Sequence, residues 1–138
     1  MRYMIIVKAT SDSEASAMPS EQLISEMATY HEELAKAGML LAASGLQPTS
    51  AGWRIEYDGE TRTVVDGPFA ETKELIAGYT LIQAASHEEA LDWTRRFPNP
   101  SIDGGRGQVE VRPLFEDDAF GDSEAMDRFK ALGIDAHE

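Results

Sequence analysis

Ionisable residues gather around one stiff turn in the middle of the chain, Asp66-Gly67-Pro68-Phe69. Asp66 ends a β-branched run, and the turn that follows is stiff because Gly tolerates unusual backbone angles while Pro fixes φ. A carboxylate held in this way could act as a general base or grip a hydrogen-bond donor of a ligand. It could equally accept backbone N–H bonds in an Asx turn, so two interpretations of Asp66 stay open.

The segment after the turn is denser in charge than a short connection requires. Lys73 could hold an anionic substrate group while Glu71 moves a proton, and Phe69 could form the wall of a cleft. The alternative is structural: Phe69 packs in the core, and the charges form weak surface ion pairs worth under about 1 kcal/mol. Arg54 has the same two interpretations, as a carboxylate-binding group or as the partner of a surface acid.

His31 borders the apolar stripe of a predicted helix, four residues after Met27 and three before Leu34. An imidazole suits proton transfer near neutral pH, although a lone helical histidine can also be a simple boundary residue. No spacing such as H-E-x-x-H predicts a metal site, and no Gly-rich motif between a strand and a helix predicts a nucleotide cofactor. The candidate catalytic residues are therefore Asp66, His31 and Glu71, the candidate ligand-binding residues are Lys73, Phe69 and Arg54, and no metal or cofactor is expected.

Periodicity and breaker residues place the elements that must position these side chains. Asp58-Gly59 is the strongest hairpin signal, and Ser86 to Glu89 form a capping box. Residues 9–18 read as an irregular connection rich in Ser and Ala, and Trp53 reads as a packing anchor. The predicted strands cover residues 2–8, 39–44, 53–57, 61–65, 75–84 and 108–113, and the predicted helices cover 19–36 and 88–96. This order predicts an α+β, ferredoxin-like fold: an antiparallel sheet with two helices on one face, plus a β-hairpin.

Two of the predicted strands, residues 2–8 and 75–84, are apolar on both alternating faces. A sheet with one face in water should alternate between apolar and polar residues instead. Because two helices cover only one face, we expect a homodimer in which the sheets of two copies pack face to face, with a cleft for a small-molecule ligand.

Residues 115–138 differ from the domain formed by residues 1–114, since they begin with an acidic run. Asp122 or Ser123 can cap a short helix that places Met126, Phe129 and Leu132 on one stripe. This stripe must pack either on its own subunit or on the dimer mate, and we favour the mate.

Composition bounds the function further. A length of 138 residues suits one domain with a real core, and the net charge of −13 repels nucleic-acid phosphates and anionic lipids. We therefore expect no nucleic-acid and no membrane partner. In addition, no apolar run approaches the roughly 20 residues that a membrane span needs.

The absence of cysteine excludes disulfides and thiolate chemistry. The chain opens with a strand pattern and not with a leader, so a cytoplasmic location is expected.

Several motifs, in order, resemble the YCII-related superfamily in its DGPF-containing branch, over residues 1–114. The most specific is the block from Val65 to Glu74. The others are Arg2-Tyr3-Met4, Leu46-Gln47-Pro48, Gly78-Tyr79, Glu89-Ala90-Leu91-Asp92-Trp93 and Val109-Glu110-Val111-Arg112-Pro113. The resemblance implies a dimeric α+β barrel built from ferredoxin-like subunits. The extension after Phe115 with its following helix also resembles that of longer relatives.

The resemblance also bears on activity. Members of the wider superfamily are suspected enzymes because they carry a His on the first helix and an Asp after the second. This chain departs from that pattern, since His31 lies about a turn from the aligned position and the Asp position falls near Phe97. Two hypotheses follow. The first is a cofactor-independent enzyme doing acid/base chemistry on a small metabolite in a cleft near the DGPF loop. The alternative is a non-catalytic ligand sensor or protein-binding dimer, in the sigma-factor-linked regulatory setting of DGPF relatives.

Overall fold

The computed structural model describes residues 1–71, 74–116 and 119–133. Its elements are β1 (Arg2–Lys8), α1 (Ser11–Glu14), α2 (Glu21–Lys36), β2 (Leu40–Gly45), the 3-10 turn η1 (Thr49–Ala51), β3 (Trp53–Asp58), β4 (Thr61–Asp66), β5 (Ile76–Gln83), α3 (His87–Arg95), β6 (Val109–Pro113) and α4 (Glu124–Ala131). The predicted strands and the two long helices are confirmed to within two residues at each end. α1 departs from the predicted irregular connection, because the side chains of Thr10 and Ser13 cap each other's backbone N–H groups within one turn.

Four strands form an antiparallel sheet in the order β2-β5-β1-β6. The hairpin β3–β4 forms a second, two-stranded sheet between β2 and β5 in the sequence. When the hairpin is set aside, the two strand-helix-strand units interleave as in a ferredoxin-like fold. The predicted α+β fold class is therefore confirmed.

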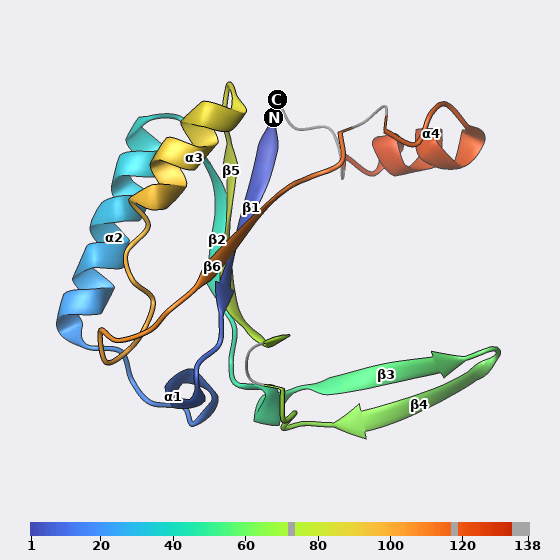
Figure 1. Ribbon diagram of the computed structural model, residues 1–138. Helices are drawn as coiled ribbons and strands as arrows, with labels where there is room; N and C mark the ends of the chain where they lie inside the picture. Colours follow the sequence, from blue (N-terminus) through green and yellow to red (C-terminus); the bar gives the residue numbers. More distant parts are fainter. Residues whose placement is uncertain (72–73, 117–118, 134–138) are drawn as a thin grey trace.

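Helices α2 and α3 lie on one face of the four-stranded sheet (Figure 1). The core between them centres on Ile5 of β1, Ile82 of β5 and Leu34 of α2, each with 0% of its surface exposed. Burial of an aliphatic side chain of this size contributes about 1.5–3 kcal/mol, so these contacts hold the helices on the sheet. Ala90 brings a small side chain to the contact surface of α3.

The other face of the sheet carries the residues that alternate with this core. Because Tyr3, Ile5, Thr80 and Ile82 face the helices, their neighbours in the strands point the opposite way. The apolar ones are Met4, Ile6, Tyr79 and Leu81, each only partly buried. Among the described residues no helix crosses this face, which we call the open sheet face (Figure 1). The homodimer expected from the two-faced strands stays a prediction.

Two arms extend on the side of the open sheet face: the hairpin β3–β4 and the segment that carries α4 (Figure 1). Ser123 caps α4 by accepting the Met126 N–H, in agreement with the sequence. Phe129 and Leu132 remain 49% and 70% exposed, so the stripe of α4 is not buried on its own subunit. That it packs on the dimer mate stays a prediction.

Within the described part of the chain, no helix combines the length and the apolar character that crossing a membrane requires.

Tyr30 joins α2 to α3 inside the core. Its hydroxyl donates a 2.7 Å hydrogen bond to the Trp93 carbonyl oxygen, and its ring packs edge-on against Trp93 and Phe97. Burial raises the pKa of Tyr30 to about 12; the charge of Glu33 adds to this effect, while Arg96 opposes it. The neutral phenol is therefore the form that the fold stabilises.

Alkaline unfolding should report on Tyr30. Since its folded pKa of about 12 exceeds the ordinary value of 10.0, its contribution to stability is complete below pH 10.0 and is lost as the pH rises through 12. Denaturant unfolding of the wild type and of Tyr30→Phe, followed by circular dichroism from pH 8 to 12, should show the steeper loss in the wild type. Parallel pH profiles would contradict this assignment.

Candidate functional site

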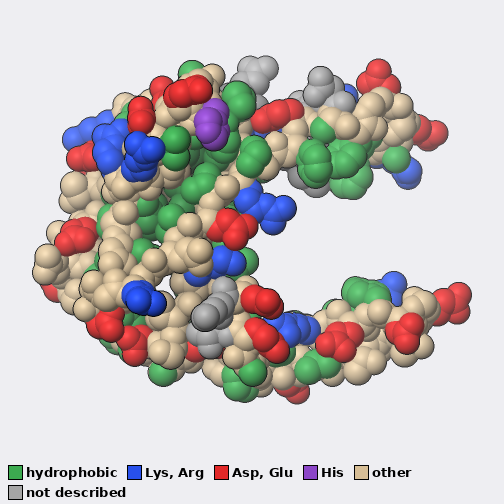
Figure 2. All heavy atoms as spheres, in the orientation of Figure 1, with side chains coloured by type: hydrophobic (Ala, Val, Ile, Leu, Met, Phe, Trp, Pro, Cys, Tyr) green, Lys and Arg blue, Asp and Glu red, His purple; other side chains and the backbone are tan. Residues whose placement is uncertain are grey.

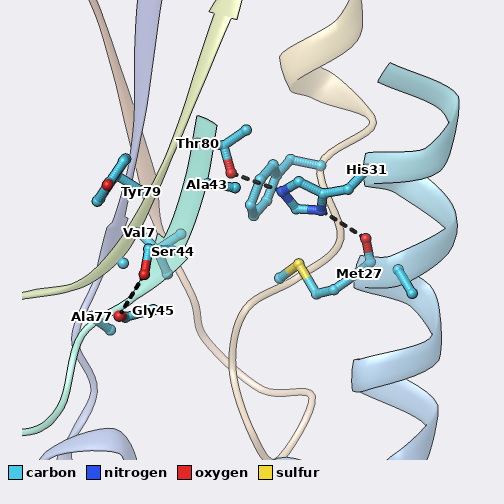
Figure 3. A pocket seen from close by; sticks show the side chains of 12 residues that line it. Val7, Met27, His31, Ala43, Ser44, Gly45, Ala77, Tyr79 and Thr80 are labelled. Atoms are coloured by element: carbon cyan, nitrogen blue, oxygen red, sulfur yellow. Dashed lines mark hydrogen bonds between the residues drawn. The ribbon is translucent and has the colours of Figure 1, made fainter. Parts of the chain in front are cut away.

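A cavity of about 400 Å³ lies between α2 and the helix-facing side of the sheet (Figure 3). Its walls are mostly apolar and include Val7, Met27, Ala43, Gly78 and Phe97, whereas its polar side chains are those of His31 and Thr80. Tyr79 also borders the cavity, but its side chain points away from His31 (Figure 3). No Asp, Glu, Lys or Arg side chain of the described residues lines the cavity.

The cavity lies beside a pair of glycines on β2 and β5. Gly45 and Gly78 are partners in the strand register. A Cβ atom at Gly78 would lie 2.9 Å from the Ser44 carbonyl oxygen, so only glycine fits there without a backbone shift. Because neither residue has a side chain, the space between β2 and α2 stays unfilled. The run of small residues over 42–45 is the sequence signal for this gap.

His31 reaches the cavity from α2 and is held at both ring nitrogens (Figure 3). Nδ1 lies 2.7 Å from the Met27 carbonyl oxygen, and Nε2 lies 2.8 Å from Thr80 Oγ1. A carbonyl oxygen can only accept a hydrogen bond, so Nδ1 carries the proton in the neutral ring. Nε2 is then the nitrogen without a proton, and it accepts a hydrogen bond from the Thr80 hydroxyl.

Thr80 is the polar partner that sequence reasoning missed. Its side chain is 2% exposed and lies on the helix-facing side of β5, between Gly78 and Ile82. A buried hydroxyl needs a hydrogen-bond partner, and His31 supplies it. The signal in the sequence is this one hydroxyl on an otherwise apolar strand face, but its partner is 49 residues away along the chain.

His31 lies close to Phe97, the residue near the Asp position that the family resemblance suggested. The ring centroids of His31 and Phe97 are 6.1 Å apart in an edge-on contact. Phe97 thus stands near the place expected for an Asp, and an aromatic ring faces the imidazole instead of a carboxylate. Thr80 provides the polar contact.

Three other candidates cluster at the base of the hairpin. The Arg54 guanidinium lies 3.7 Å from the centroid of the Phe69 ring, a cation–π contact. Arg54 Nη1 also lies 4.0 Å from Glu71 Oε2, with both side chains about half exposed. An ion pair this exposed is worth under about 1 kcal/mol. The structure therefore brings Arg54, Phe69 and Glu71 together, but none of them lines the cavity beside His31.

The remaining two candidates are Asp66 and Lys73. Asp66 is exposed and pairs with Trp53 in the hairpin register, and it is not among the residues that line the cavity. Lys73 lies outside the described residues. Of the five predicted site residues that the structure describes, His31 is the one that lines the cavity.

The turn at residues 66–69 is anchored to the rest of the chain. The Phe69 N–H donates a 3.1 Å hydrogen bond to Thr49 Oγ1, and the Thr49 hydroxyl in turn donates to Glu14 Oε2 at 2.6 Å. The Gly67 N–H donates to the Gly52 carbonyl oxygen, and the Gly67–Pro68 peptide bond is cis. The motif thus docks onto η1 and α1, which gives its residues a structural role.

Among the described residues, no three of His, Cys, Asp or Glu gather closely enough to hold a metal ion.

Substitution of Gly67 should test this anchoring. A Cβ atom there would lie 1.8 Å from the Thr49 carbonyl oxygen, whereas one at Gly52 would lie 3.8 Å from the same atom. Gly67→Ala should therefore lower the free energy of unfolding by about 1–3 kcal/mol, measured by urea titration. Gly52→Ala, in the same turn, is the control and should change it by less than about 0.5 kcal/mol. Equal effects would show that the turn is not tightly packed on η1.

Known proteins that are similar to this chain include an uncharacterised protein of Rhizobium meliloti (strain 1021). It is 37% identical over 94 residues, which are 68% of this chain and 74% of that protein. A structure of 5-chloro-2-hydroxyhydroquinone dehydrochlorinase from Burkholderia phenoliruptrix AC1100, in complex with 2,5-dihydroxybenzoquinone, is also similar. It is 13% identical with a TM-score of 0.45, and the match covers 84% of this chain and 95% of that one. The model of the YCII-related domain matches residues 1–116, and the chain therefore belongs to the YCII-related family.

Proposed function

We propose that this protein is a cofactor-independent enzyme that moves a proton on a small, uncharged molecule bound beside His31. The observation that carries the proposal is the pairing of His31 Nε2 with Thr80 Oγ1 at 2.8 Å in the wall of a cavity. A base within hydrogen-bond reach of a proton relay, next to a space for substrate, is the arrangement that general acid–base catalysis needs.

The hydrogen bonds of His31 suit both of its protonation states. In the neutral ring Nδ1 donates to the Met27 carbonyl oxygen and Nε2 accepts from Thr80. In the imidazolium both nitrogens donate, and the Thr80 hydroxyl can turn to accept, because a hydroxyl is both donor and acceptor. Gaining a proton therefore leaves no ring nitrogen without a partner. This property supports a role as a base that is also able to give the proton back.

The proton path follows from these contacts. The Thr80 hydroxyl gives its proton to Nε2 and takes one from an O–H or activated C–H of the substrate. The substrate keeps the electron pair, and the imidazolium carries the positive charge. In the return step the proton passes from Nε2 through Thr80 to a different substrate atom, or to a leaving group. The net result is an isomerisation or an elimination, and neither consumes a cofactor.

The composition of the cavity supports an uncharged substrate. A buried carboxylate or phosphate would lose its hydration without gaining an opposite charge, since the described lining residues carry no Lys or Arg. Phe97 and Met27 supply an aromatic ring and a flexible thioether, which suit a flat or alicyclic ring. A volume of about 400 Å³ admits a small metabolite.

Exchange of substrate hydrogen with solvent deuterium tests the proposal even where the final product is unidentified. The probes are cyclic ketones, enols and lactones, each paired with an analogue that bears a carboxylate. Incubation in D₂O followed by mass spectrometry should show enzyme-dependent deuterium uptake by uncharged probes. His31→Gln should slow this exchange about 100-fold or more, because general acid–base groups contribute about 10²–10⁴. Thr80→Val should slow it as well, and Thr80→Ser should restore it, because serine keeps the hydroxyl.

The matched control is His87→Gln, which removes an exposed histidine from the first turn of α3 and should leave exchange unchanged. Exchange that survives in His31→Gln would contradict the assignment of the base. Exchange confined to the carboxylate analogues would contradict the proposed substrate class.

A further inference from the structure

One face of the hairpin β3–β4 is an uncovered apolar stripe. In the register Trp53 pairs with Asp66, Ile55 with Val64 and Tyr57 with Arg62, and paired residues share a face. The apolar members, Trp53, Ile55, Tyr57 and Val64, are 64%, 45%, 63% and 63% exposed. The prediction that Trp53 anchors packing is thus wrong for the single chain. We call these four residues the hairpin stripe.

The opposite face of the same hairpin is mainly polar, although Val65, the partner of Arg54, also lies on it. Glu56 pairs with Thr63 and Asp58 with Thr61, and all four are exposed. The hairpin therefore has a regular apolar side and a mainly polar side, as a strand pair does when one side packs on another surface. A two-stranded hairpin with nothing on its apolar side is at best marginally stable in water. Something should cover the hairpin stripe.

The position of the hairpin indicates where that cover lies. The hairpin reaches out from the four-stranded sheet on the side of the open sheet face (Figure 1). A hollow separates it from the arm that carries α4 (Figure 2). A body seated in this hollow would meet the apolar residues of the open sheet face and would lie within reach of the hairpin.

The distribution of charge favours a second copy of this chain as that body. Two copies, each with a net charge of −13, repel each other unless the meeting surfaces lack the excess of acid. The charged residues whose strand positions place them on the open sheet face are Arg2, Lys8, Glu110 and Arg112. Arg2 is buried and lies 3.7 Å from Glu116, and Lys8 pairs with Glu110 at 3.5 Å. Those on the face of the hairpin stripe are Arg62 and Asp66. Neither surface carries net negative charge.

Apolar residues with a few balanced charges beside them are also the usual composition of a protein interface. Arg62 further covers Tyr57, with its guanidinium 5.0 Å from the ring centroid. A foreign partner selected by charge would instead be basic and would meet the acidic remainder of the surface.

We propose that the hairpin stripe of each chain docks on a second copy of the chain that sits against its open sheet face. A two-fold axis makes the contact reciprocal, so both stripes are buried and the assembly closes at two copies. The sheet-to-sheet dimer expected from the strands does not require this contact. The proposal is also independent of the proposed enzymatic function.

A charge placed in the hairpin stripe should weaken the dimer. Val64→Lys puts an ammonium group on the apolar face, and Thr63→Lys puts the same group on the polar face one residue away. Sedimentation velocity over a range of protein concentrations should show a dimer for the wild type. Val64→Lys should raise its dissociation constant by about tenfold or more, and Thr63→Lys by less than about twofold. Circular dichroism at high concentration checks that both variants fold.

Cross-linking locates the contact directly and does not depend on a disruptive substitution. The chain contains no cysteine, so Tyr57→Cys creates one site for a benzophenone maleimide. After photolysis of a mixture of ¹⁵N-labelled and unlabelled chains, mass spectrometry should find links between chains from position 57 to peptides of β1 or β5. A monomer at all concentrations would overturn the proposal. So would a dimer in which Val64→Lys and Thr63→Lys behave alike and the links fall on other surfaces.

Discussion

Burial of Ile5, Leu34 and Ile82 between α2 and the sheet decides which side chains of β1 and β5 face the helices. In a strand, successive side chains alternate, so once Ile82 is buried, Thr80 must lie on the same side and Tyr79 and Leu81 on the other. A shift of one residue would move Thr80 to the open sheet face and remove the partner of His31. The candidate site and the open sheet face are two consequences of the same packing.

The cavity exists because this packing is incomplete at one end of the sheet. At Gly78 the backbone of β2 lies so close to β5 that no side chain fits, and the space between the sheet and α2 is lined by His31 and Phe97. Thr80 is 2% exposed, so its end of the hydrogen bond with His31 lies in apolar surroundings, where such a bond is stronger than in water. The result is an imidazole hydrogen-bonded to a hydroxyl in a mostly apolar cavity.

The turn at residues 66–69 has a different part in the molecule. Its glycine lies against the Thr49 carbonyl oxygen, and its Phe69 N–H is tied through Thr49 to Glu14. These contacts demand particular residues at particular positions, which is how a motif can be highly specific without lining the cavity. The turn also sets the base of the hairpin, where Arg54 lies between Phe69 and Glu71. From there the hairpin extends past the open sheet face (Figure 1).

Local pattern in the sequence was enough to determine the strands, the two long helices, the hairpin and the cap at Ser86, because each depends on neighbouring residues. It narrowed the cap of α4 to Asp122 or Ser123. It also marked His31, which borders the apolar stripe of α2. It left out α1, whose single turn rests on two side-chain caps, and it gave no partner to His31. Only the tertiary structure decided that Thr80 faces His31, that Arg54, Phe69 and Glu71 gather away from it, and that Trp53 stays exposed. The physical reason is that strand register and helix packing join residues far apart in the chain, and no local period encodes which of them meet.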